Sequence, residues 1–218
     1  MIEYPDYYRK GMGTENVGPF LRSIIQMARP KKVLELGMGY TSLFLLEALE
    51  KNKELFDDGS GHLDQTYVKN HNKEYNPKFV VIDDKSFIDN EGSPEWSKIE
   101  NELNKSEYTE IIEDRFQGNS QKLFNKYGTF DFVWFDCSND TPELLDFMKE
   151  YWDICSGYVI FHFTHQFQKP NNTLGIITAL ATGNPQHIDI LEPHKNYQGS
   201  ITVLKKCPWE TRKNIKEV

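Results

Sequence analysis

Residues 31–49 read KKVLELGMGYTSLFLLEAL, a short apolar run, two glycines and an amphipathic run in succession. The run at 32–36 has the length of a buried strand, and the run at 41–52 has the apolar spacing of a helix. Gly37 and Gly39, between them, let a ligand approach the backbone closely at the point where the helix begins. We therefore expect a strand, a glycine turn and a helix that form one wall of a ligand site.

The rest of the chain repeats this alternation of strand-like and helix-like runs. Short buried strands separated by helices predict a Rossmann-like α/β fold with a doubly wound, seven-stranded, mostly parallel sheet. The last two strands, joined through EPHKNYQG, predict an antiparallel C-terminal hairpin at the sheet edge. The further strands are expected at 78–83, 109–114, 131–136, 157–163, 187–192 and 199–205, and the further helices at 15–28, 94–104, 119–126, 141–153 and 173–182.

The length of 218 residues predicts a single domain that spans 1–218. Residues 1–30 are interpreted as an N-terminal arm and helix. The polar segment 51–77 delays the second strand beyond the usual crossover length, and we expect it to be an inserted surface loop rather than a second domain.

Composition limits the classes of partner. The chain has 25 basic and 33 acidic residues, a net charge of −8, which argues against nucleic acid because duplex binding needs a basic face. No run approaches the length of a membrane span, and the N-terminus has no signal-peptide core, so we expect no membrane partner and a cytoplasmic location. The three scattered cysteines agree with a reducing compartment. The fold is compatible with a homodimer.

Carboxylates lie near the ends of three expected strands. Glu35 precedes the glycine turn, Asp83 and Asp84 end the second strand, and Asp136 ends the fourth. Because ligands of open α/β sheets bind beyond the carboxyl ends of the strands, we expect Glu35, Asp83 and Asp136 to face one crevice. A dinucleotide loop would have a third glycine where Ser42 stands, and a carboxylate before the turn suits a ligand with a positive group such as an α-amino group.

These features resemble class I S-adenosylmethionine-dependent methyltransferases: E-x-G-x-G-x-T/S, an acidic end to the second strand, and an aromatic fourth strand that ends in Asp. The resemblance covers roughly residues 14–205 and is nearest to small-molecule O-methyltransferases of the catechol and caffeoyl-CoA type. GMGTENVGPF at 11–20 and QGNSQKLF at 117–124 fit two further motifs of that group. The resemblance implies an enzyme that transfers a methyl group from S-adenosylmethionine to an oxygen, nitrogen or carbon atom of a small acceptor.

The resemblance also implies which residues would hold the cofactor. Asp83 would bind the ribose hydroxyls, Asp84 would lie next to the adenine, and Asp136 would lie beside the methyl group and the substrate. The methionine part would contact Glu35, Gly37, Gly39, Thr41 and Ser42, and the adenine would be bordered by Gly118, Asn119 and Ser120.

The fifth expected strand leads into two histidines, His162 and His165, where the metal-dependent members of the resembled group have an Asp-Asn pair. Magnesium prefers oxygen ligands, so this difference argues against a catechol-type magnesium mechanism. We predict that one of the two histidines is a general base oriented by Asp136. A transition-metal site of Asp136, His162 and His165 is an alternative, and a histidine packed in the core is another.

Aromatic residues are the candidates for contact with the acceptor. Tyr7 and Tyr8 belong to an N-terminal arm that could close over the substrate. Trp134 lies near the end of the fourth expected strand, at the same edge of the sheet. Cys137 is interpreted as a small packed residue. Two functions besides methyl transfer stay open: aminopropyl transfer in the same pocket, for which Asp136 and Asp140 would be a minimal acidic pair, and a binding module without catalysis.

Overall fold

The computed structural model of the chain describes residues 4–8, 13–57, 75–86, 94–138, 140–165, 172–183, 185–192 and 199–206. Most of the expected insertion lies outside these residues, and its first part, 51–57, is helical rather than a loop because the helix that follows the glycine turn continues to Asp57. Of the described residues, no helix is long and apolar enough to cross a membrane.

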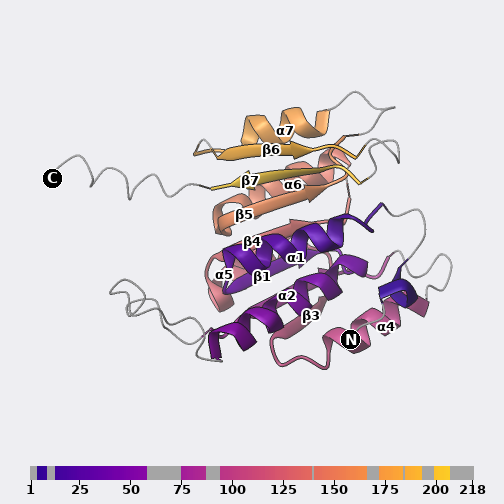
Figure 1. Cartoon of the computed structure of the whole chain (residues 1–218). Coiled ribbons are helices and arrows are strands. Elements are labelled where there is room, and N and C mark those ends of the chain that lie inside the picture. Colours follow the sequence, from indigo (N-terminus) through magenta and orange to yellow (C-terminus); the bar gives the residue numbers. More distant parts are fainter. Residues whose placement is uncertain are drawn as a thin grey trace.

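In the described part of the chain, seven strands form one sheet in the order β3-β2-β1-β4-β5-β7-β6 (Figure 1). Neighbours from β3 to β5 are parallel, and β7 runs antiparallel to both β5 and β6. The sheet therefore confirms the predicted Rossmann-like architecture with its antiparallel C-terminal hairpin. The strands are β1 (Lys32–Leu36), β2 (Lys78–Asp83), β3 (Thr109–Glu113), β4 (Phe130–Phe135), β5 (Cys155–His162), β6 (Gln186–Ile190) and β7 (Ile201–Lys205).

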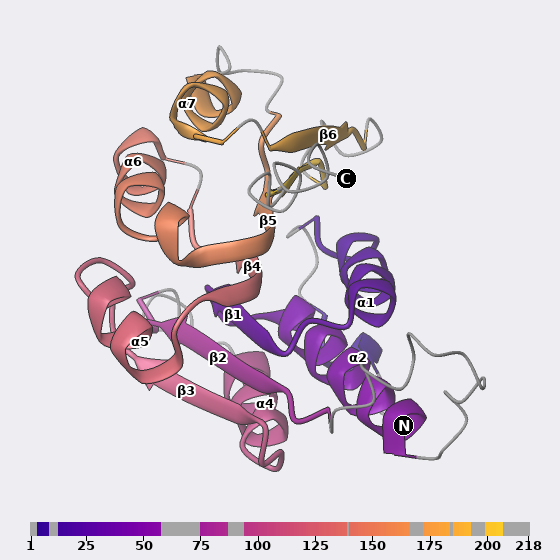
Figure 2. The same ribbon diagram turned by 90° about the vertical axis from the view of Figure 1, so that its left-hand side faces the viewer.

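Helices cover both faces of the sheet (Figure 2). Alternation along the strands sends successive side chains to opposite faces, so Val33 packs into one core cluster and Leu34 into the other. One face carries α1 (Val17–Ala28), α2 (Tyr40–Asp57) and α4 (Pro94–Leu103); the other carries α5 (Ser120–Tyr127), α6 (Thr141–Glu150) and α7 (Asn172–Leu180). Two 3-10 turns, η1 (Tyr4–Tyr7) and η2 (Trp152–Ile154), complete the described elements.

The helix expected at 141–153 ends three residues early, at Glu150. Tyr151 and Trp152 are both buried, and the chain tightens into η2 before β5 begins at Cys155. The turn brings Trp152 into the core cluster on the α6 face. This packing is a tertiary effect that overrides the helical pattern of the sequence.

The sheet order places β1 beside β4. The chain leaves β1 for β2 and β3 on one side, and it leaves β4 for β5 on the other. The loops that follow β1 and β4 therefore diverge at the carboxyl ends of the strands, which is the place where open α/β sheets bind their ligands.

Candidate functional site

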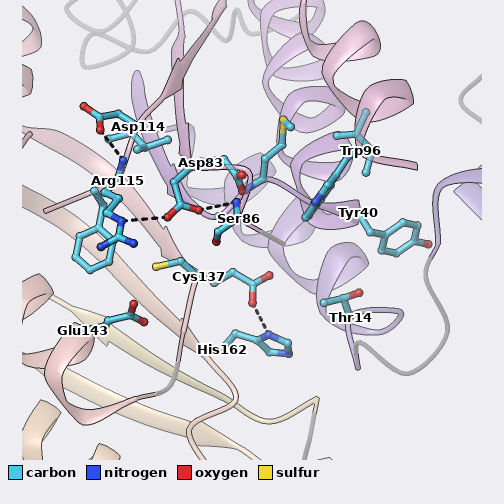
Figure 3. A pocket seen from close by; sticks show the side chains of 18 of the residues that line it. Thr14, Tyr40, Asp83, Ser86, Trp96, Asp114, Arg115, Cys137, Glu143 and His162 are labelled. Carbon is cyan, nitrogen blue, oxygen red and sulfur yellow. Dashed lines mark hydrogen bonds and ion pairs between the residues drawn. The ribbon is translucent and has the colours of Figure 1, made fainter. Parts of the chain in front are cut away.

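A cavity of about 300 Å³ opens at this switch point, a volume within the usual range of small-molecule sites (Figure 3). Its wall comes from the N-terminal segment, the turn after β1, the start of α2, the end of β2, α4, the loop after β3, the segment after β4, the first turn of α6 and the last residue of β5. The lining residues are Tyr7, Thr14, Gly37, Met38, Gly39, Tyr40, Ile82, Asp83, Asp84, Ser86, Trp96, Ile99, Asp114, Arg115, Phe116, Gln117, Asp136, Cys137, Glu143 and His162.

The glycine turn is held tightly between β4 and α4. Gly37 has φ +96°, and a Cβ on it would lie 2.8 Å from the carbonyl carbon and oxygen of Asp136. A Cβ on Gly39 would lie 3.2 Å from the Trp96 ring. The amide of Gly37 donates to the carbonyl of Ile82 at 2.9 Å, which fixes the turn to β2. Gly37 is therefore required both by its backbone conformation and by its neighbour.

Asp83 stabilises the turn rather than presenting a free carboxylate. Its Oδ2 accepts from the Met38 amide and its Oδ1 from the Lys85 amide, both at 2.7 Å. Burial raises the pKa of Asp83, and the two amides oppose that shift. Both carboxylate oxygens of Asp83 are therefore hydrogen-bonded to backbone amides.

Asp84, the next residue, lines the same cavity and stays charged. Its Oδ1 accepts from the Ser86 amide at 2.9 Å, and its Oδ2 lies 3.6 Å from Nε of Arg115. Partial burial opposes ionisation, but the bonds from Ser86 and the charge of Arg115 outweigh it and lower the pKa of Asp84. Asp84 is exposed and Asp83 is partly buried, so Asp84 is the more accessible of the two to a ligand.

Glu35 lies behind the turn and does not line the cavity. Its Oε1 accepts from the Thr41 hydroxyl at 3.2 Å, and that hydroxyl accepts from Nε1 of Trp134 at 3.1 Å. Burial raises the pKa of Glu35 well above its usual range; the charge of Asp136 adds to the shift, and the hydroxyls of Ser42 and Thr41 oppose it. The structure therefore brings Asp83 and Asp136 to the crevice, while Glu35, Thr41, Ser42 and Trp134 are buried beneath it.

His162 and Asp136 form a dyad at the cavity. Nδ1 of His162 lies 2.5 Å from Oδ1 of Asp136, and the two side chains are only 8% and 18% exposed. The Trp134 ring packs against the imidazole at 5.6 Å between centroids. The amide of Asp136 donates to the carbonyl of Leu36 at 2.8 Å, so the end of β1 anchors the carboxylate that orients the imidazole.

His165 lies elsewhere, because the chain turns at Phe163, which has φ 58°. Its Nε2 lies 3.7 Å from Oδ1 of Asp189, an oxygen that also contacts His187 at 2.9 Å and accepts from Thr202 at 2.6 Å. Within the described ranges, no group of three or more His, Cys, Asp or Glu side chains could hold a metal ion. The alternative metal set of Asp136, His162 and His165 is therefore not assembled.

The loop after β3 contributes Asp114 to Gln117 to the cavity, and not the 118–120 segment. The Gly118 amide donates to Glu150 at 2.7 Å. Nδ2 of Asn119 donates to Oδ2 of Asp114 at 3.0 Å and to the carbonyl of Arg115 at 2.7 Å. Gly118 and Asn119 thus hold the loop in place from behind, and Ser120 begins α5.

The aromatic candidates divide in the same way. Tyr7 lines the cavity, and its hydroxyl donates to Glu102 at 3.3 Å. Tyr8 bonds to Glu15 at 2.8 Å and packs edge-on against Tyr40, which lines the cavity in its place. Tyr40, Thr14 and Trp96 were not identified from the sequence. Tyr40 lies within the quoted glycine motif, and its position directly after Gly39 was a usable signal.

Cys137 also lines the cavity, although it was expected to be packed. By surface area the residue is exposed to the cavity, although many protein atoms surround its thiol. This burial raises the pKa of the Cys137 thiol well above its usual range, and the charges of Glu143 and Asp136 raise it further. The sulfur is therefore a neutral thiol and not a nucleophilic thiolate at neutral pH.

No protein-family model matches the sequence, and no curated protein sequence matches it significantly. Solved structures do match. The chain has the α/β fold of structures described as methyltransferases, at sequence identities low enough that the likeness concerns the fold.

An O-methyltransferase from Bacillus cereus in complex with SAH has a TM-score of 0.57 and 15% identity, over 88% of this chain and 81% of its own. A SAH-bound methyltransferase from Podospora anserina has a TM-score of 0.53 and 13% identity, over 94% and 82%. An O-methyltransferase from Streptomyces achromogenes, involved in tomaymycin synthesis and solved with SAM, has a TM-score of 0.52 and 15% identity, over 93% and 83%. The fold predicted from the resemblance is confirmed.

Proposed function

We propose that this protein transfers a methyl group from S-adenosylmethionine to a small-molecule acceptor. The observation that carries the proposal is the cavity at the β1–β4 switch point, in which a compressed glycine turn meets the carboxylates of Asp84 and Asp136. The shared fold with structures that contain SAH or SAM supports the same cofactor here.

The lining residues fit that cofactor. Asp84 is better placed than Asp83 to accept from the two ribose hydroxyls, because it is the more exposed of the two. The acidic wall suits the ammonium and sulfonium charges of the methionine part.

When bound, S-adenosylmethionine supplies an electrophilic methyl group. The protein's own residues have to bind the acceptor in line with that group and accept a proton from it. His162 is the proton acceptor in this proposal, because it is the imidazole that lines the cavity and a neutral imidazole can accept a proton. Asp136 holds the imidazole by Nδ1 and stabilises the imidazolium that forms.

Two measurements test the proposal. The first is calorimetric titration of the protein with S-adenosylhomocysteine (SAH), and the second is SAH formation from S-adenosylmethionine with a panel of phenols, amines and acidic C–H compounds. We expect binding, and turnover that falls by about 10²–10⁴-fold in His162→Asn while SAH still binds. His187→Asn makes the same chemical change on β6 outside the cavity and should keep its activity. No binding at millimolar SAH would refute the proposal.

A further inference from the structure

Aromatic side chains line one side of the cavity. Figure 3 shows Thr14, Tyr40 and Trp96 on the same side of the view as His162, while Arg115 and Glu143 lie on the other side of Cys137. Tyr7, from the N-terminal segment, also lines the cavity. Because the proposed proton acceptor belongs to this end, it is the place for the acceptor molecule, and the end with Arg115 is left for the cofactor.

The charge of the cavity selects among acceptors. Its described lining has five carboxylates, those of Asp83, Asp84, Asp114, Asp136 and Glu143, against the single cation of Arg115. Arg115 is itself 3.6 Å from Asp84, so its charge is already opposed. A bound cofactor adds a net charge of about +1, which leaves the field in the cavity negative. An anionic acceptor is therefore repelled, and a cationic one is attracted.

The aromatic wall favours the same kind of molecule. Faces of Tyr and Trp rings attract an ammonium group, and they also pack against an apolar body.

From this arrangement we infer that the acceptor is a small amine with an apolar or aromatic body, bound as its ammonium ion and methylated on nitrogen. The inference rests on the proposed function, since it names the substrate class of the same site. It selects nitrogen from the oxygen, nitrogen and carbon acceptors that the resemblance leaves open, and it depends on the carboxylates and rings that line the cavity.

The proton and electron balance follows from the dyad. The ammonium group first gives one proton to the imidazole of His162, which Asp136 stabilises as imidazolium. The nitrogen lone pair then forms a bond to the methyl carbon, while the carbon–sulfur bond breaks and its electron pair stays on sulfur. The product is a methylated ammonium ion and a neutral thioether, and the proton on His162 passes to water.

Three probes with one carbon skeleton test the charge preference. Tyramine is a cation, tyrosol is neutral, and 4-hydroxyphenylacetate is an anion, and all three carry the same phenol. We expect tyramine to bind the SAH-loaded protein about 3–30-fold more tightly than tyrosol, the range of a cation–π contact. The anion should bind more weakly than both. Equal or tighter binding of tyrosol or of the anion would overturn the inference, as would no binding of tyramine.

The same probe reports the atom that is methylated. Incubated with S-adenosylmethionine, tyramine should give the N-methyl product and not the O-methyl product, which fragmentation in mass spectrometry distinguishes. Methylation on oxygen overturns the inference and leaves the proposed function in place, whereas failure to bind SAH removes the proposed function itself.

A substitution in the wall links the preference to the structure. Trp96→Leu keeps an apolar side chain and removes the ring, so tyramine affinity should fall about 3–30-fold while tyrosol affinity changes less. Phe124→Leu makes the matched change at an exposed aromatic on α5 outside the cavity, and it should alter neither. If both probes weaken equally in Trp96→Leu, the ring contributes packing and not charge recognition, which contradicts the inference.

Discussion

At the scale of single residues, Glu35 is a carboxyl group whose ionisation the fold opposes. It is fully buried, and its Oε2 has no hydrogen-bond partner among the described residues. A carboxyl group in such surroundings favours its neutral form, since burial penalises the charge. Glu35 thus accepts a hydrogen bond from Thr41 while it resists ionisation.

The stability of the protein should therefore fall as pH rises above about 4.5, the ordinary pKa of this side chain. Below that pH, Glu35 is protonated in both the folded and the unfolded chain. Above it, the unfolded chain loses the proton and the folded protein retains it until its raised pKa is passed, so the penalty grows through this window and then stays constant. Glu35→Gln, which is always neutral, should raise Tm at pH 7.5 by about 2–4 °C for each kcal/mol of penalty removed.

Thermal unfolding at steps between pH 4 and pH 8 measures this difference. The advantage of Glu35→Gln should be absent at the acidic end and grow with pH. Glu107→Gln makes the same change at an exposed position after α4 and should show no such trend. An advantage that is equal at all pH values would contradict the raised pKa.

Gly37 allows a second prediction at this scale. Gly37→Ala would place a methyl group 2.8 Å from the Asp136 carbonyl, in a backbone conformation that only glycine adopts readily. We expect a loss of about 1–3 kcal/mol in the free energy of unfolding, and SAH binding below detection. Gly175→Ala is the matched control, because no atom lies within 4 Å of a Cβ added there. Denaturant titration and calorimetry measure both effects, and normal SAH affinity in Gly37→Ala would count against the site.

From the sequence, the candidate site residues could be assigned to a region of the fold but not to individual positions in the cavity. The motif located the turn, the strand ends and His162, and all of these meet at the cavity. Which of two adjacent aspartates faces a ligand depends on the direction of each side chain, and Asp83 is turned toward the amide of Met38. Trp96 comes from a segment outside the quoted motifs, and Thr14 lies in the 11–20 motif, so only the folded chain brings them to the glycine turn.

At the scale of elements, prediction succeeded because most strands were bounded by turns with clear chemistry. Strands β1 and β2 begin and end where the pattern placed them. Strand β5 begins two residues earlier than expected, at Cys155, and pairs with β4 through an irregular register between Phe130 and Phe132. No sequence pattern marks such an irregularity, because it arises from the fit of two neighbouring strands.

Gly157 is the residue on which this β4–β5 pairing depends. A Cβ on Gly157 would overlap the carbonyl oxygen of Asp131 on the neighbouring strand. Gly157→Ala should therefore lower the free energy of unfolding by more than about 2 kcal/mol, since either strand has to move. Thermal or denaturant unfolding checks this, again against Gly175→Ala. A change within about 0.5 kcal/mol would mean that the strands separate easily.

At the scale of the whole molecule, two helical layers share one sheet, and the cavity touches α2, α4, the end of β5 and the first turn of α6. The single domain over 1–218 stays a prediction, and cooperative unfolding tests it. Far-UV and near-UV circular dichroism should give one coincident transition.

SAH at 100 times its Kd should then raise Tm by about 5–11 °C, the shift that about 2.7 kcal/mol of binding energy gives in a chain of this size. Two separate transitions, with SAH shifting one of them, would contradict the prediction.

The backbone of Asp136 lies against the glycine turn after β1, and its side chain is paired with His162 at the end of β5. Asp136 therefore links these two parts of the site. Any change that widens the gap between β1 and β4 will therefore also move the imidazole. A single displacement of Asp136 would therefore both distort the glycine turn and misalign the imidazole of His162. An inactive variant of the turn will then report a geometric fault at His162 as readily as a lost cofactor, and only separate measurements of affinity and of turnover with the cofactor saturating can tell the two apart.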